Sequence, residues 1–275
     1  MNSPAEAGPD AAGETAGIPS ETTIDAFYAG RFHLVQPKGR GFRAGLDALL
    51  LSASLLPTRR GRGVDLGSGA GAASFAAAVR CPELALTLVE RDPEMAGLAR
   101  RSLALAENAA LAARLNVIEA DVLSRRPARE AAGLFDGAFT TVLTNPPFYP
   151  LGSRGSPDPL RQAARTIPDR AFLGGWVCTA AALLEEGGLL AMIARPDSLP
   201  DILEASRNRL GDIRILPVHS HPDRRAIRIL VQARKGSRAV LSLLPPAALL
   251  GANGVETAFG QAISIGAAID LPGLW

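Results

Sequence analysis

"GVDLGSGAGAASFAAAVR", residues 63 to 80, joins an apolar stretch to an alanine-rich stretch through a glycine-rich turn. The apolar stretch predicts a buried strand, and residues 72 to 80 predict a helix. Gly67, Gly69 and Gly71 lie between them, and glycine permits both a tight turn and the close approach of another molecule to the backbone. A strand, a glycine turn and a helix in this order open a layered sheet whose strands run parallel.

The same alternation continues along the chain. Apolar stretches predict strands, and amphipathic or alanine-rich stretches predict helices. Because the helices have crossover length, we expect an α/β fold with a mostly parallel sheet and helices on both of its faces. The predicted strands are 84–91, 115–122, 137–145, 187–195 and a closing pair at 213–220 and 225–234, and the predicted helices are 46–56, 93–111, 169–186 and 199–210.

The length of 275 residues and the hydrophobic share of 47% indicate a globular protein. We expect residues 1–20 to be a disordered tail and residues 21–275 to form a single domain. Residues 24–60 precede the glycine turn as an N-terminal cap segment, and residues 236–275 form a C-terminal extension of unknown role. No apolar run approaches the roughly 18 to 20 residues of a membrane helix, and the N-terminus lacks signal-peptide features, so we expect a cytoplasmic protein without a membrane partner.

Residue types that bind metals and phosphates are unevenly distributed. Cys81, Cys178 and the three histidines lack the spacing of a metal site, so we expect no metal. The formal net charge is only +2, but residues 207–238 contain eight arginines and one lysine against two acidic residues. Such a region is either an ordinary solvated surface or a surface for phosphate groups.

Acidic residues follow three of the predicted strands, where ligands of parallel sheets bind. Asp65 precedes a glycine turn that loosely fits the G-x-G-x-x-A pattern of a dinucleotide site. A carboxylate there would repel a pyrophosphate, but it would attract the ammonium and sulfonium of S-adenosylmethionine. Glu90, 19 residues past Gly71, suits the ribose hydroxyls of either ligand. Asp121 can accept a bond from an adenine amine while Val122 packs on the ring, or it can be an ordinary turn residue.

The fourth strand end continues as "TNPPFYP", residues 144 to 150. Prolines cannot extend a sheet, so they hold the chain rigid here. The side-chain oxygen of Asn145 and the carbonyl of Pro146 can both accept hydrogen bonds from an amine whose lone pair is delocalised. These bonds localise the lone pair toward a methyl donor, and Phe148 can stack on a planar group. Taken alone, Asn-Pro-Pro also fits an ordinary turn.

With these residues in this order, residues 24–235 resemble the class I S-adenosylmethionine-dependent methyltransferases that carry the [DNS]-P-P-[YFW] motif for methylation of amino nitrogens. More narrowly, the chain is similar to the bacterial tRNA (valine) adenine-N6-methyltransferases of the methyltransferase small family. That similarity rests on "LVQPKGRGFRAGLDALLLSA" (34–53), "NPPFY" and "RQAART" (161–166). Phe148 stands where tyrosine is more common, which keeps the stacking and removes a hydroxyl.

The resemblance implies a Rossmann-like, doubly wound, mostly parallel seven-stranded sheet, with S-adenosylmethionine as cofactor and tRNA as partner. It implies that residues 34–53 cover the methionine end of the donor, and that residues 207–238 with Arg161 and Arg165 hold RNA phosphates. The candidate catalytic residues are Asn145, Pro146, Pro147 and Phe148, and the candidate donor-binding residues are Asp65, Gly67, Ser68, Gly69, Gly71, Glu90, Arg91, Asp121, Val122 and Asn145.

Two functions fit these motifs. The first is methylation of adenine N6 in tRNA near the anticodon, where a base leaves its stack readily. The second is methylation of glutamine N5 in a release factor or ribosomal protein, but such enzymes usually carry a separate N-terminal helical domain, and only about 60 residues precede the glycine turn. A non-catalytic binding module fits less well, because Asp65, Glu90 and Asn145 are all present. A dehydrogenase fits least, because no hydride-transfer residue is recognisable.

Overall fold

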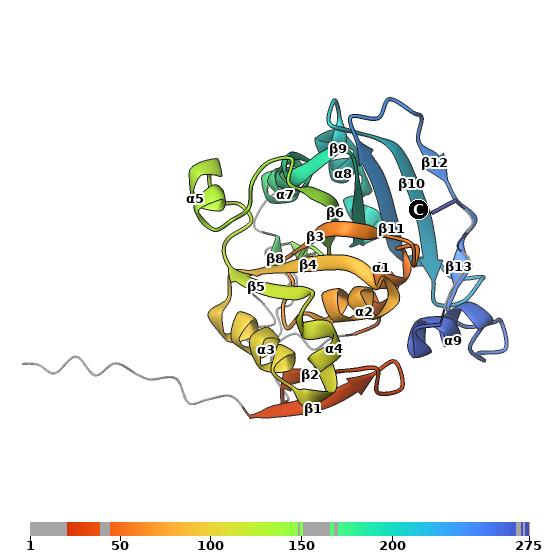
Figure 1. Ribbon diagram of the computed structural model, residues 1–275. Helices are drawn as coiled ribbons and strands as arrows, with labels where there is room; N and C mark the ends of the chain where they lie inside the picture. Colours follow the sequence, from red (N-terminus) through yellow and green to blue (C-terminus); the bar gives the residue numbers. More distant parts are fainter. Residues whose placement is uncertain are drawn as a thin grey trace, which may run out of the picture.

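The computed structural model describes residues 21–38, 45–147, 149–150, 166–167, 170–267, 271 and 273–274 (Figure 1). The predicted tail (1–20), residues 151–165 with Arg161 and Arg165, and Phe148 lie outside the described residues. Two short strands, β7 (Tyr149–Pro150) and β8 (Thr166–Ile167), pair with each other in parallel.

Five parallel strands and an antiparallel hairpin form the central sheet of the described residues. The order is β12-β10-β11-β9-β6-β3-β4-β5, with β13 also paired to β10 as the ninth strand. The seven long strands agree with the predicted fold, whereas the two-residue strands β12 and β13 from the C-terminal extension are not among the predicted elements. The strands are β3 (Arg60–Leu66), β4 (Glu83–Glu90), β5 (Leu115–Glu119), β6 (Phe139–Thr144), β9 (Leu184–Ala194), β10 (Leu210–His219), β11 (Ala226–Lys235), β12 (Ser242–Leu243) and β13 (Ala247–Ala248).

Helices cover both faces of the sheet, which explains why its strands are almost continuously apolar (Figure 1). Alternate residues of β9 enter opposite cores: Leu189, Ala191 and Ile193 on one face, and Leu190, Met192 and Ala194 on the other. The first core lies under α1 (Leu46–Ala53), α2 (Ala72–Arg80), α3 (Pro93–Leu103), α4 (Ala109–Ala112) and α9 (Ala258–Ile265), and the second under α7 (Arg170–Leu183) and α8 (Leu199–Ser206). None of the described helices is long and apolar enough to cross a bilayer.

The helix predicted over 93–111 is interrupted, and a contact with the N-terminal segment explains why. The backbone at Leu105 is extended, and the chain resumes as a 3-10 turn, η1 (Ala106–Asn108), followed by α4. Asn108 accepts a hydrogen bond from the His33 N–H at 2.9 Å and donates one to the His33 carbonyl at 2.7 Å. His33 lies in β2 (Phe32–Pro37), which forms a hairpin with β1 (Thr22–Phe27). These tertiary bonds override the local preference for a continuous helix.

The C-terminal extension closes the first core against the N-terminal part of the chain. Ile263 of α9 is fully buried in that core. Gly266 ends the helix with φ of 68°, and a Cβ at this position would lie 2.4 Å from the ring of Tyr28. Arg80 at the end of α2 donates a hydrogen bond to the Ala267 carbonyl at 2.8 Å. The described part of the extension is therefore integrated into the fold through packing that no local motif predicts.

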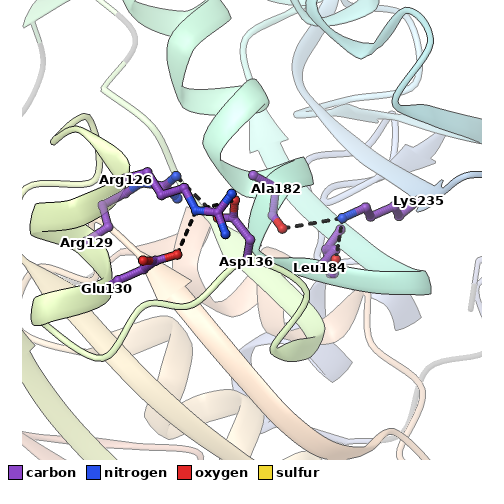
Figure 2. A network of polar contacts seen from close by, with 7 residues as sticks. All are labelled: Arg126, Arg129, Glu130, Asp136, Ala182, Leu184 and Lys235. Carbon is purple, nitrogen blue, oxygen red and sulfur yellow. Dashed lines mark hydrogen bonds and ion pairs between the residues drawn. The ribbon is translucent and has the colours of Figure 1, made fainter.

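Two polar contacts lie where β6 and β9 begin (Figure 2). Arg129 of α5 (Arg126–Ala131) donates to the Asp136 carboxylate at 3.3 Å, just before β6. Lys235, the last residue of β11, donates to the carbonyls of Leu184 at 2.7 Å and Ala182 at 3.4 Å, at the end of α7 and the start of β9. The ammonium of Lys235 thus stabilises the fold, because it donates hydrogen bonds to carbonyls at the end of a helix.

Candidate active site

The candidate site lies where the strand order of the sheet reverses. β4 and β5 follow β3 on one side, whereas β6 pairs with β3 on the other side. In register, Leu66 is opposite Val89 of β4 and Thr144 of β6. The glycine turn, Glu90 and Asn145 therefore leave adjacent parallel strands at the same carboxyl edge. This is the topological switch point at which α/β sheets bind ligands.

The glycine turn bends tightly across the edge of β4. The N–H groups of Gly67 and Ser68 both donate to the Val89 carbonyl, at 2.9 and 3.0 Å. Gly71 precedes α2 with φ of 95°, and a Cβ there would lie 2.8 Å from Leu88. A larger residue at position 71 is thus excluded both by its backbone conformation and by the space available.

Asp65 is a buried carboxylate at the end of β3. Its side chain accepts a hydrogen bond from the Ser74 hydroxyl at 2.7 Å, and it makes no ion pair with any cationic side chain among the described residues. The pKa of Asp65 is raised from 3.8 to about 7, chiefly because burial desolvates the carboxylate; the Ser74 hydrogen bond opposes this rise, and the nearby carboxylate of Glu90 contributes to it. A buried anion of this kind favours a ligand that brings a positive charge.

Glu90 ties the end of β4 to the glycine turn. One carboxylate oxygen accepts the Gly69 N–H at 2.8 Å, and the other accepts the N–H groups of Arg91 at 2.8 Å and Asp92 at 2.9 Å. Burial raises the pKa of Glu90, and the three backbone bonds act in the opposite direction. The oxygen that accepts only the Gly69 N–H retains acceptor capacity for a ligand hydroxyl. Arg91 takes part through its backbone, since its side chain is exposed.

Asp121 and Val122 lie at the next strand end but in different environments. The Ala120 N–H donates to the Glu90 carbonyl at 3.0 Å, which places this turn beside Glu90. The Asp121 carboxylate is exposed and accepts the Leu123 N–H at 2.8 Å, whereas Val122 is buried in the second core. Among the described residues, no group of three or more His, Cys, Asp or Glu side chains is placed to hold a metal ion.

Asn145 directly follows β6 and carries a buried acceptor without a partner. Its Oδ1 accepts no hydrogen bond within the described part of the chain, and the same holds for the Oγ of Ser68 in the glycine turn. Buried polar atoms are almost always paired, so such an atom indicates a missing partner. Pro146 is buried beside Asn145, and Pro147 is partly buried. The two unpaired oxygens extend from the adjacent strands β3 and β6, which is the arrangement a bound ligand would satisfy.

A small apolar cluster connects the N-terminal segment to the glycine turn. Val35 of β2 packs with Ala70, Met95 and Leu98. Val35, which belongs to the predicted 34–53 segment, thus lies beside the turn and the start of α3, whereas residues 46–53 form α1 over the first core and residues 39–44 are outside the described residues.

Thr144 and Trp176 hold this edge together, although neither is among the residues predicted for the site. The indole Nε1 of Trp176 on α7 donates to the Thr144 hydroxyl at 2.8 Å, which in turn donates to the Leu66 carbonyl at 2.8 Å. A Cβ at Gly67 would lie 3.0 Å from the same indole. The chain of bonds therefore links the ends of β3 and β6 under the glycine turn. In the sequence, only the presence of a tryptophan within an apolar helix could indicate this bond, because a buried indole N–H requires a hydrogen-bond acceptor.

Replacing Trp176 with phenylalanine keeps an aromatic ring against the turn but leaves the Thr144 hydroxyl without its buried donor. We expect the free energy of unfolding to fall by about 1–3 kcal/mol, the cost of an unsatisfied buried polar group. Urea unfolding measures this change. Phe172→Leu serves as a control, because Phe172 packs on Trp176 without a polar bond. An unchanged midpoint for Trp176→Phe would contradict the structural role of the bond.

The fold and the site together define a class I S-adenosylmethionine-dependent methyltransferase. Residues 46–206 match the Methyltransferase small domain family, which is more than half of the chain. The chain belongs to this family, and S-adenosylmethionine is its cofactor.

Curated relatives extend beyond the family match. The tRNA1(Val) (adenine(37)-N6)-methyltransferase of Porphyromonas gingivalis is 30% identical over 224 residues, covering 78% of this chain and 83% of the relative. The release factor glutamine methyltransferase of Deinococcus radiodurans is 31% identical over 151 residues, covering 51% of this chain and 48% of the relative. The similarity to the first relative thus includes much more of both proteins.

Solved structures show the same fold. A protein of Agrobacterium tumefaciens described as a predicted O-methyltransferase has a TM-score of 0.69 and 39% identity, covering 81% of this chain and 98% of the other. The T. thermophilus 16S rRNA N2 G1207 methyltransferase, crystallised with AdoMet and guanosine, has a TM-score of 0.52 and 22% identity, covering 81% of this chain and 53% of the other. The second comparison supports the fold alone.

Proposed function

We propose that this enzyme methylates the N6 amine of an adenine next to the anticodon of a tRNA. The observation that carries the proposal is the buried, unpartnered Oδ1 of Asn145 at the switch point. Two acceptors suit an amine, which offers two N–H donors, and a hydroxyl offers only one. Asn145 and the adjacent Pro146 carbonyl therefore favour methyl transfer to a nitrogen atom. They fit less well with methyl transfer to an oxygen atom, which the description of the A. tumefaciens protein names.

The contacts around the glycine turn support the donor-binding roles that we propose. We propose that the negative charge of Asp65 attracts the ammonium and sulfonium end of the donor, and that Glu90 accepts hydrogen bonds from the ribose hydroxyls. Gly67, Gly69 and Gly71 let the backbone approach the donor, and the unpaired Ser68 hydroxyl is available to a polar group of it. Asp121 at the following strand end is assigned to the adenine amine, with Val122 supporting the turn from the core and Arg91 contributing its backbone. When bound, S-adenosylmethionine supplies an electrophilic methyl group.

Asn145 and Pro146 are proposed to orient the amine nitrogen rather than to remove its proton. The lone pair of an exocyclic amine is delocalised into the ring, which makes the nitrogen a poor nucleophile. Hydrogen bonds from the amine to the Asn145 oxygen and the Pro146 carbonyl favour a geometry in which that lone pair points at the donor. A general base is not required, because the nitrogen becomes strongly acidic once it is methylated. The predicted stacking by Phe148 completes this assignment.

The substrate class is supported by the relatives rather than by the acceptor chemistry. Glutamine N5 presents the same pair of N–H donors, so Asn145 and Pro146 fit both substrates. The tRNA adenine-N6-methyltransferase matches 78% of this chain, whereas the release factor enzyme matches 51%.

The two substrates are separated by one assay. Labelled S-adenosylmethionine is supplied with unmodified bulk tRNA in one reaction and with release factor in the other, and the digested products are analysed by mass spectrometry. We expect N6-methyladenosine in the tRNA reaction and no label on the protein. N5-methylglutamine in the second reaction with unlabelled tRNA in the first would replace this proposal with the glutamine function.

A further inference from the structure

The basic region 207–238 does not form one surface, because it folds into an antiparallel hairpin. Leu210 at the start of β10 is opposite Lys235 at the end of β11, and His219 at the end of β10 is opposite Ala226. β11 also runs antiparallel to β9, which is parallel to β6. The turn between His219 and Ala226 therefore lies at the carboxyl edge of the sheet with Asn145, and the other end of the hairpin lies at the opposite edge.

Most cationic side chains of this region already have partners within the fold. At the opposite edge, Lys235 binds two carbonyls (Figure 2), Arg234 donates to the Gly187 carbonyl, and Arg209 donates to the Arg207 carbonyl. The remaining engaged cations form ion pairs: Arg207, just after α8, with Glu204, and on the strands Arg214 with Asp212 and Arg228 with Asp47. Their donors are partly occupied by these bonds, so the groups are less available to phosphates than an unpaired guanidinium, although Arg207 itself is largely exposed.

Arg224 and Arg225 differ from these residues. Both are exposed at the tip of the hairpin, and neither side chain makes an ion pair or hydrogen bond with the part of the chain that the structure describes. The tip is held in place by its backbone, since the Arg224 carbonyl lies 2.6 Å from Nδ1 of His219 and the Arg224 N–H donates to the His221 carbonyl at 3.2 Å. Asp223 is the one acidic residue of the tip.

The register places this tip outside the methyl-transfer edge. Thr144 is opposite Met192, and Met192 is opposite Val231, so Asn145 is level with Leu230. Ala226, where β11 begins, lies four positions beyond that level, roughly 13 Å outward at about 3.3 Å per residue, and the tip arginines lie in the turn next to it. β11 is two strands from β6, about 10 Å to the side. At this spacing, the tip would meet phosphates a few nucleotides away from a base that lies at Asn145.

We propose that the β10–β11 hairpin tip, through Arg224 and Arg225, is the surface that holds the phosphates of the RNA substrate. The opposite edge of the sheet, although richer in arginine, does not take part. The inference rests on the proposed RNA substrate and specifies where that substrate lies. Paired exposed guanidiniums on a fixed turn suit two consecutive phosphates.

The test compares two double variants that remove the same charge from opposite edges. Arg224→Ala/Arg225→Ala removes the tip, and Arg207→Ala/Arg238→Ala is the matched control, because both of its residues are exposed and Arg238 has no side-chain partner among the described residues. Binding of unmodified bulk tRNA is measured by filter retention across a salt series. For the tip variant we expect at least tenfold weaker binding at 0.1 M salt, and a slope of log affinity against log salt that is smaller by about 1.5.

Catalysis supplies the second readout. The tip variant is expected to raise the KM for tRNA by at least tenfold while the dissociation constant for S-adenosylmethionine and the melting temperature stay at the parent values. The control variant should behave like the parent in every measurement. Arg224→Glu/Arg225→Glu should weaken tRNA binding further than the alanine pair does.

The outcomes separate this inference from the proposed function. Tip-dependent tRNA binding without any methylation of tRNA would support the surface and overturn the adenine-N6 function. Equal loss in the tip and control variants, or no loss in either, would overturn the surface even if tRNA is methylated.

Discussion

Asn145→Ala is expected to lower the rate constant of methylation by roughly 10²–10³-fold, the effect typical of removing one positioned hydrogen-bonding group from a transition state. The dissociation constant for S-adenosylmethionine should change by less than about twofold, because the proposed role of the unpaired Asn145 oxygen is to bind the amine of the substrate. Single-turnover methylation of tRNA and calorimetric titration of the donor measure the two quantities separately.

Two further variants serve as controls for Asn145→Ala. Asn145→Asp keeps an acceptor at the same place, so it should retain more activity than the alanine variant, and the [DNS]-P-P-[YFW] pattern allows that residue. Asn116→Ala removes an exposed asparagine from β5 and should leave both quantities unchanged. Full activity of Asn145→Ala would exclude Asn145 as the acceptor and with it the proposed mechanism.

Asp65→Asn is expected to weaken binding of S-adenosylmethionine at pH 8 by roughly 30-fold or more, as expected when one partner of a buried charge pair is neutralised. The substitution keeps the size and an acceptor for the Ser74 hydroxyl, which bonds to Asp65 at 2.7 Å. It removes only the negative charge. Calorimetric titration measures the change, and Glu83→Gln, at the exposed amino end of β4, is the charge-matched control.

The same carboxylate should make donor binding depend on pH. With a pKa of about 7 in the ligand-free protein, Asp65 is mostly ionised at pH 8 and mostly protonated at pH 6. A cationic donor requires the ionised form, so its affinity should fall by roughly tenfold from pH 8 to pH 6. Asp65→Asn should show a much flatter profile over this range. A parental affinity that is constant between pH 6 and 8 would mean that another group carries the charge complementarity.

Linkage gives the opposite sign for the stability of the ligand-free protein. The folded-state pKa of Asp65, about 7, lies above the ordinary value of 3.8, so the folded state binds this proton more tightly than the unfolded state does. The contribution of Asp65 to the free energy of unfolding therefore decreases as the pH rises from about 4 to 7. Asp65→Asn should raise the stability at pH 8 while it weakens donor binding. This combination would distinguish a residue kept for function from one kept for stability.

The candidate site was largely predictable because its residues directly follow the strands. Asp65, Glu90 and Asn145 each end or follow a strand that the apolar pattern locates, and parallel strands bring their carboxyl ends to one edge. Thr144 and Trp176 were not predictable, since their bond joins residues 32 positions apart. The interruption at Leu105 and the docking of α9 on Tyr28 depend on similar distant contacts.

The sequence by itself determined the alternation of strands and helices, the glycine turn, and the order of the acidic residues and the Asn-Pro-Pro motif. These features depend on local periodicity and on the backbone preferences of glycine and proline. Only the tertiary structure decided which arginines of the 207–238 region remain free and at which edge they lie. The physical reason is that an antiparallel hairpin separates neighbours in sequence by the length of the sheet, and ion pairs with distant residues such as Asp47 use charges that composition counts as available.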